Sequence, residues 1–170
     1  MKKSMLFAAV LVVGLFQFTF ASATDDGYQP VPTNPETQAF YIESLINNEG
    51  KLELTADHIE WYEGEEANEV FREREQDSEM TEAPSGYYIV NDSDDLQTYE
   101  VADDAVVLMQ IWNRTGNMDE ADTVWNEEIS LEKFIELVNS DEDEGFIKDF
   151  PYHISIKDGK ITKIVQQFIP

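Results

Sequence analysis

A tight hairpin is encoded at the end of the chain, in the stretch FPYHISIKDGKITKIVQQFIP that begins at Phe150. Asp158-Gly159 is a dipeptide favoured in two-residue turns, where both central residues need positive φ. In that register Ile156 faces Ile161, and apolar residues alternate with polar ones. One face then carries Tyr152, Ile154, Ile156, Ile161 and Val165, and the other carries His153, Ser155, Lys157, Lys160 and Thr162. The pattern predicts antiparallel sheet with one buried face.

A second hairpin is predicted from Ala39 onward. The run AFYIESLI is followed by the turn sequence NNEG and by a second run, KLELTADHIEWY. Leu52 and Leu54 share one face of this second run, whereas Ile59 and Trp61 have the opposite parity. We therefore expect a bulge or bend in the returning strand, near Ala56 to His58.

Three further runs, YYIV, LQTYEV and AVVLMQIW, have strand character, and acidic segments separate them. NDSDD (91–95) and ADD (102–104) contain residues that favour turns. We expect the chain to break its strands at both places. In the polar connection that follows, Trp125 is the residue expected to pack back onto the body of the protein.

Two helices are predicted by apolar residues spaced three and four apart. The first, in GEEANEVFREREQDS, would bury Ala67, Val70 and Phe71. The second, in SLEKFIELVNS, has Ser130 placed to cap its start and an apolar stripe. That stripe is Leu131, Phe134, Ile135 and Val138. The predicted fold is α+β, a twisted antiparallel sheet or partly closed small β-barrel of five to seven strands with two helices, in a single domain over residues 37–170.

The N-terminus has the pattern of a secretory signal. Lys2 and Lys3 precede an apolar run, and Ala21-Ser22-Ala23 is a small-residue cleavage site. We expect residues 1–23 to be removed, residues 24–36 to form an extended leader, and the protein to be secreted without membrane insertion after cleavage. No cysteine is present, so the 147 residues that remain must fold without disulfides.

The chain is very acidic, with a formal net charge of −25. Such a charge repels nucleic acid and anionic lipid surfaces. Two explanations stay open: adaptation to a saline or alkaline medium, where salt screens the repulsion, and a surface for a cationic partner. Because the acids are spread along the chain, the pattern favours adaptation.

Two acidic segments are weak candidates for calcium. In the first, counting from Asn91, a calcium loop would need glycine and glutamate at the positions that hold Leu96 and Ala102. The loop template therefore fails, and what remains is a surface site without a template. Its candidate residues are Asp92, Asp94 and Asp95, with Asp141 and Asp143 in the second segment, DEDEG. No other cofactor is indicated.

Catalytic signatures are not evident. There is no cysteine, and neither His58 nor His153 lies in a nucleophile or zinc motif. Glu60 and Glu63 are the first carboxylate pair to consider for glycoside hydrolysis, which needs one acid kept protonated by apolar surroundings. A glycan platform is the alternative use of the aromatic residues. Its candidates are Trp61, Tyr62 and Trp112.

Several segments resemble a group of small secreted proteins of Gram-positive bacteria that are uncharacterised. The resemblance lies in GKLELTADHIEWYEGEEANEVF, GYYIVND, LQTYEVADDAVV and DGKITKIVQQFIP. It implies export and a compact, mainly β fold, and no activity. We therefore expect a non-enzymatic, monomeric binding or interaction domain with an unknown extracellular partner. The alternatives are a calcium-dependent envelope protein and a glycan binder.

Overall fold

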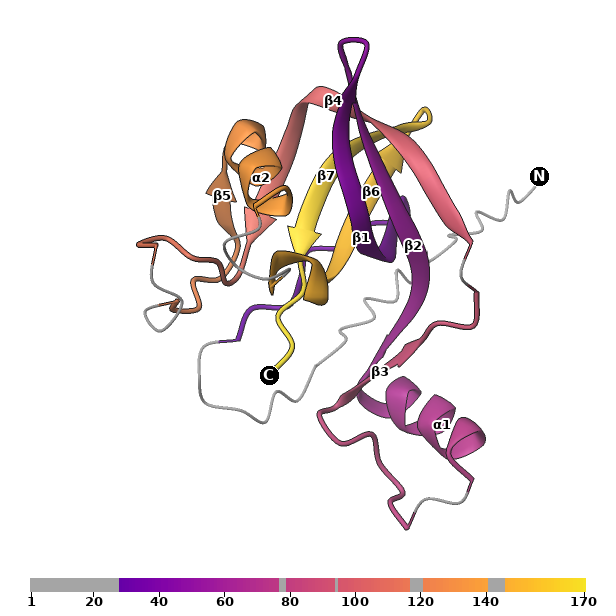
Figure 1. The fold of residues 1–170 in the computed structure, drawn as a ribbon. Helices are drawn as coiled ribbons and strands as arrows, with labels where there is room; N and C mark the ends of the chain where they lie inside the picture. The colour runs from indigo at the N-terminus through magenta and orange to yellow at the C-terminus, as the bar shows by residue number, and fades with distance from the viewer. Residues whose placement is uncertain (1–27, 77–78, 94, 117–120, 141–145) are drawn as a thin grey trace, which may run out of the picture.

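The computed structural model describes residues 28–76, 79–93, 95–116, 121–140 and 146–170 (Figure 1). Its strands are β1 (Thr37–Asn48), β2 (Lys51–Glu63), β3 (Tyr87–Val90), β4 (Leu96–Met109), β5 (Glu127–Ile129), β6 (Pro151–Lys157) and β7 (Lys160–Gln166). Its helices are α1 (Gly64–Arg74), α2 (Leu131–Val138) and the short 3-10 helix η2 (Phe146–Asp149).

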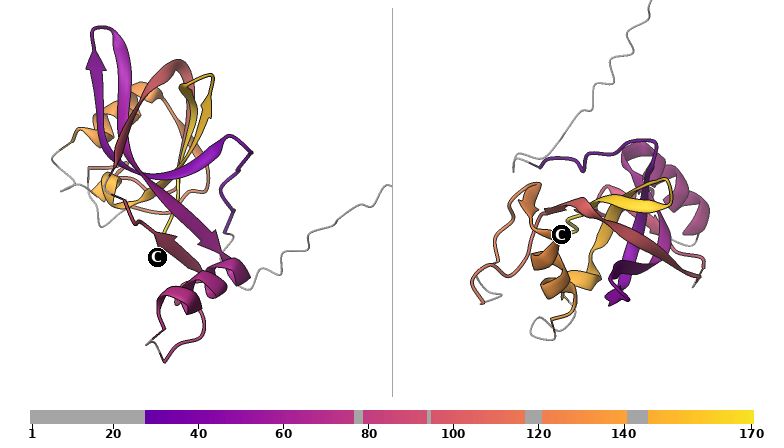
Figure 2. Two further views of the ribbon diagram at one scale, coloured as in Figure 1. Left: turned by 90° about the vertical axis from the view of Figure 1, so that its right-hand side faces the viewer. Right: turned by 90° about the horizontal axis from the view of Figure 1, so that it is seen from above.

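Five of the strands form a closed barrel. The sheet has the order β3-β2-β1-β6-β7-β4-β5, and an additional pairing of β2 with β4 closes it. Figure 2 shows the barrel with α1 and β3 projecting from one end. The predicted α+β fold, a small barrel with two helices, is confirmed. One pairing, β4 with β7, is parallel, because α2, η2 and β6 form the crossover between these strands.

The five barrel strands have a recognisable connectivity. Numbered among themselves in chain order, they lie in the order 1-2-3-5-4-1, strands 3 and 5 are parallel, and α2 stands between strands 3 and 4. This is the connectivity of the OB fold, a five-stranded Greek-key barrel. Folds of this kind carry many unrelated functions, so the function must be argued from the site.

Both predicted hairpins close with two-residue turns. Glu49 and Gly50 have φ values of 52° and 88°, and Asp158 and Gly159 have 51° and 80°. Such paired positive angles are strained for residues other than glycine, asparagine and aspartate, and they match the twist of the flanking strands.

The register of the last hairpin is confirmed at its turn, where Ile156 faces Ile161. The register then shifts, so Thr162 has no partner on β6. As a result Ile154 lies opposite Ile164 and not Lys163, and Tyr152 lies opposite Gln166 and not Val165. The prediction that Val165 shares the core face is therefore wrong: Val165 lies opposite His153, on the other face of the sheet.

The bulge of the first hairpin lies on β1, not on β2. The register shifts between Ile42 and Ser44, which leaves Glu43 as the extra residue. The predicted bulge between Ala56 and His58 is wrong, because β2 stays in register with β1 there. The apolar residues of β2 change parity because both of its faces are covered: Ala56 faces the barrel core, and Ile59, only 2% exposed, faces the other side.

β4 runs through the predicted break at 102–104 as one continuous strand. It pairs with β2 from Leu96 to Glu100, with β7 from Glu100 to Leu108, and with β5 at its end. The register against β7 shifts between Val101 and Val106, and Asp103 and Asp104 are exposed at this shift. The acidic residues therefore occupy the solvent side of a strand, and the predicted turn is wrong.

The two helices have different roles. In α2 the Ser130 hydroxyl oxygen accepts a hydrogen bond from the Lys133 N–H at 3.1 Å, as predicted for a cap. Phe134, Leu137 and Val138 of α2 are buried in the core of the barrel. In contrast, α1 packs on a separate small cluster of Ala67, Phe71 and Ala83 with Tyr62 and Tyr88 at its edge.

The side chain of Gln166 provides a hydrogen-bond acceptor for backbone N–H groups just after the end of β4. Its fully buried side-chain oxygen accepts from the N–H groups of Gln110 and Ile111, each at 2.9 Å. We expect Gln166→Leu to lower the free energy of unfolding by about 2 kcal/mol, because two buried donors lose their acceptor. Urea unfolding measures this. Gln38→Leu, at an exposed position on β1, is the control and should change stability by less than about 0.5 kcal/mol; equal losses would contradict this role of Gln166.

Candidate functional site

Two adjoining hollows lie on the outer side of the barrel, at the end of β2 that leads into α1. Their volumes are about 840 Å³ and about 430 Å³, and Tyr28, Trp61 and Glu63 line both. We call them together the Trp61 groove. Its other aromatic side chains are Tyr62, Tyr87, Trp125 and Phe168, and its acidic side chains also include Glu60 and Glu66.

Trp61 is fixed by β3 and by a hydrogen bond. The pairing of β2 with β3 sets Glu63 opposite Tyr87, so the rings of Trp61 and Tyr87 stack with centroids 4.7 Å apart and an angle of 12°. The Trp61 Nε1–H donates to Glu63 Oε1 at 2.8 Å. The half-buried indole is thus held in one orientation and still lines both hollows.

His153 lies against Trp61 inside the groove. Their ring centroids are 5.7 Å apart and nearly perpendicular. His153 is only 6% exposed, and its Nε2 lies 3.2 Å from Gln167 Oε1. Burial lowers the pKa of His153 to about 4. The imidazole is therefore neutral near pH 7 and gives the groove no positive charge.

The opposite wall comes from both ends of the described chain. Tyr28 belongs to a segment without helix or strand, residues 28–34, and its ring meets Trp125 edge to face at 5.2 Å. Trp125 in turn contacts Phe168 at 5.8 Å, so its predicted packing onto the body is confirmed. Burial raises the pKa of Tyr28, and the nearby charge of Glu63 adds to this effect.

The charges of the groove have one sign. Glu60, Glu63 and Glu66 are exposed at its rim, and no lysine or arginine of the described residues lines it. Glu60 accepts the hydroxyl hydrogen of Tyr62 at 2.6 Å. Because both Glu60 and Glu63 are open to solvent, neither has the apolar surroundings that a general acid of a glycosidase requires.

Two of the three candidate platform residues lie at the groove. Tyr62 follows Trp61 on β2, so it points mainly to the other face, where it packs with Tyr88 at the α1 cluster, but it also lines the larger hollow. Trp112 lies elsewhere, with Arg114 and Lys133 over its ring at 5.1 Å and 5.7 Å. Trp61 is the one of the three that lines both hollows.

Sequence reasoning missed most of the groove. Tyr87 had a local signal, since it opens the YYIV run expected to pair as a strand. Tyr28 and Phe168 had none, because they come from an irregular leader and from the residues beyond the last strand. Trp125 was expected to pack onto the body of the protein, but not at this groove. His153 was placed on the polar face of its hairpin, and the structure shows that this face is covered.

The calcium candidates are only partly described. Asp92 accepts both guanidinium hydrogen bonds of Arg74, at 2.8 Å and 2.7 Å, and this pairing lowers the pKa of Asp92. Asp95 is exposed. Asp94, Asp141 and Asp143 lie outside the described residues. Across the part of the chain that is described, no three His, Cys, Asp or Glu side chains are grouped to hold a metal ion. Calcium binding stays a prediction.

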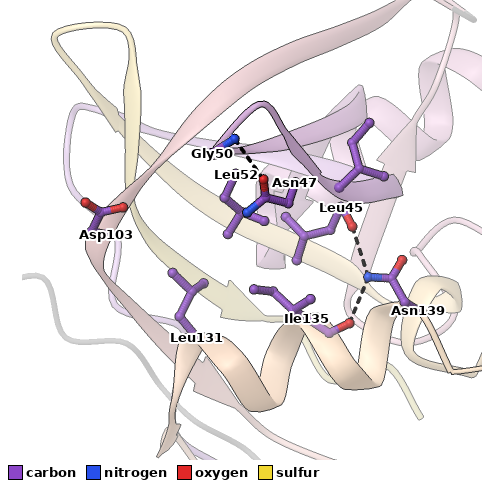
Figure 3. Close-up of a pocket in the computed structure, with 9 residues that line it drawn as sticks. Leu45, Asn47, Gly50, Leu52, Asp103, Leu131, Ile135 and Asn139 are labelled. Atoms are coloured by element: carbon purple, nitrogen blue, oxygen red, sulfur yellow. Dashed lines mark hydrogen bonds between the residues drawn. The ribbon is translucent and has the colours of Figure 1, made fainter.

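A third hollow, of about 530 Å³, lies between the β1–β2 turn and α2 (Figure 3). Two of its polar side chains are already used: Asn47 accepts from the Gly50 N–H at 3.0 Å, and Asn139 Nδ2 donates to the carbonyl oxygens of Leu45 and Ile135, each at 2.9 Å. Asp103 is the third polar side chain of the hollow. Leu52 and Leu131 add apolar walls. These bonds tie the hairpin to the end of α2, a structural role.

Comparison with known proteins gave no match: no family model, no curated protein and no solved structure is similar enough to be assigned to this chain. Among the described residues, no helix has the length and hydrophobicity needed to span a membrane. The predicted signal segment lies outside these residues. The function must therefore be argued from the groove itself.

Proposed function

We propose that this protein is a secreted, non-enzymatic binding module that holds a glycan in the Trp61 groove. The observation that carries the proposal is an open groove in which the stacked Trp61 and Tyr87 rings face the same space as exposed carboxylates. The signal sequence supports an extracellular place of action.

The chemistry of the groove suits a sugar. A pyranose ring has an apolar face of C–H groups and a rim of hydroxyl groups. An aromatic ring can cover the apolar face, and carboxylates can accept hydrogen bonds from the hydroxyls. The larger hollow, about 840 Å³, has the size typical of small-ligand sites, which run from roughly 300 to 1,000 Å³.

Other partners fit less well. Nucleic acids and other polyanions would meet Glu60, Glu63 and Glu66 and find no lysine or arginine along the described walls of the groove. The net charge of the chain, −25, adds to this repulsion. We therefore infer that the ligand is neutral or cationic. We also propose that the protein binds it as a monomer.

Trp61→Ala is expected to weaken glycan binding at least tenfold, because a buried aromatic anchor contributes about 1.5–2 kcal/mol or more. Titration calorimetry against β-1,4-linked glucose, glucosamine and N-acetylglucosamine oligomers measures the effect. Trp112→Ala is the matched control: Trp112 is also half-buried, and its Nε1–H also donates to a glutamate, Glu127, at 2.8 Å. It should leave the affinity unchanged.

Two results would contradict the proposal. One is an equal loss of affinity in Trp61→Ala and Trp112→Ala, with both variants folded by circular dichroism. The other is hydrolysis of the glycans by the purified mature protein, with the activity lost in Glu60→Gln or Glu63→Gln. The second result would replace the binding module with a glycosidase.

A further inference from the structure

We propose that the Trp61 groove selects glycans with free amino groups, so that its ligand is a polymer of 2-amino sugars in the ammonium form. This inference rests on the proposed function and names the class of ligand for the same groove. It is carried by three observations: carboxylates without an ion-pair partner, aromatic rings beside them, and no lysine or arginine along the described walls.

The carboxylates of the groove have no cation of their own. No ion pair of the described chain includes Glu60, Glu63 or Glu66. The cations that do form pairs bind other acids: Lys51 and Lys160 bind Glu100, Arg72 binds Glu65, Arg74 binds Asp92, Arg114 binds Glu127, and Lys133 binds Glu136. The groove thus keeps its negative charge for a ligand.

A neighbouring cation is already engaged. Arg74, at the end of α1, lies close enough to feel the charge of Glu60, but both of its terminal nitrogens donate to Asp92. Two histidines line the larger hollow: His153 is buried and neutral near pH 7, and His58 is exposed. An ammonium group entering the groove would meet carboxylates without displacing a lysine or arginine side chain.

The rings strengthen the preference. A cation near the face of a tryptophan or tyrosine gains about 0.5–2 kcal/mol, depending on how well it is desolvated. Trp61, Tyr87 and Tyr28 line the same groove as Glu63. The Glu63 carboxylate accepts from Trp61 Nε1 through Oε1, so its charge is held beside the indole. Aromatic rings and carboxylate together distinguish an amino sugar from its N-acetylated form.

The test compares two tetramers of equal length, β-1,4-linked glucosamine and its N-acetylated counterpart, by titration calorimetry at low salt and pH 6. We expect the amino form to bind about tenfold more tightly, and the preference to shrink as salt is added, since exposed charges are screened. Glu63→Gln should remove most of the preference, because glutamine can still accept from Trp61 while the charge is lost. Glu132→Gln, an exposed change on α2, removes one charge outside the groove and should keep it.

Each outcome decides a different point. Equal binding of both tetramers, lost in Trp61→Ala, would overturn the amino-sugar preference and leave the glycan module standing. No binding of either tetramer, or of the glucose oligomers, would contradict both. If tri-lysine bound as tightly as the amino tetramer, the groove would recognise positive charge alone. That result would overturn the assignment of a glycan as the ligand.

Discussion

Phe134→Ala is expected to lower the free energy of unfolding by about 4 kcal/mol, the largest effect of any single change considered for this chain. Phe134 has no exposed surface, and its ring meets that of Tyr152, also fully buried, with centroids 5.8 Å apart. It is the most deeply buried of the three α2 residues in the barrel core, the others being Leu137 and Val138. Truncation would remove this contact and leave a cavity in a closed barrel whose strands cannot move inward independently.

Urea unfolding, followed by tryptophan fluorescence, gives the free energy. Ile135→Ala is the control, because Ile135 lies on the same helix, is only half-buried and faces the hollow under the β1–β2 turn. It should cost about 1 kcal/mol. Equal losses at the two positions would show that α2 is not anchored in the barrel by Phe134.

Acid is expected to destabilise the wild-type protein by about 3 kcal/mol more than it destabilises His153→Gln. The pKa of His153 is about 4 in the folded protein and near 6.5 when unfolded, so the unfolded chain takes up the proton first as the pH falls. The stability due to neutral His153 is complete above pH 6.5 and is lost progressively down to pH 4. A difference of about 2.5 pKa units corresponds to about 3 kcal/mol.

The measurement is urea unfolding of both proteins at several pH values from 7.5 to 3.5. The carboxylates titrate in both proteins, so their effect largely cancels when the two free energies of unfolding are subtracted. The difference that remains is due to the protonation of His153. The difference should appear between pH 6.5 and 4. If it stayed constant over the whole range, His153 would not be held neutral against Trp61.

Local elements of this fold could be predicted from the sequence. Turn dipeptides and helix periodicity involve neighbouring residues, so the Asp158-Gly159 hairpin and α2, with Ser130 at its start, could be identified in advance. Long-range pairing could not. The closing contact of β2 with β4 and the parallel contact of β4 with β7 join segments whose partners no local pattern specifies.

Two of the errors, the bulge expected in β2 and the uncovered polar face expected for the last hairpin, share one physical cause. The alternation of apolar and polar residues along a strand identifies the face that points to the core only when the other face of the strand is exposed to water. β2 buries Ala56 on one side and Ile59 on the other, and β7 buries Ile164 inside and Val165 outside. The outer face of the barrel is covered near the groove, which the sequence pattern could not show. The sequence analysis singled out Trp61, Tyr62 and Trp125, but not Tyr28, Tyr87 and Phe168, which join them in the groove.

Titration of ¹⁵N-labelled protein with the glucosamine tetramer, observed at the indole N–H signals of the three tryptophans, tests the central claim most directly. If the Trp61 groove binds the glycan, the signals of Trp61 and Trp125, which line it, should shift together and saturate, while that of Trp112 stays in place. A shift at Trp112 without one at Trp61, or no shift at saturating ligand, would contradict the account.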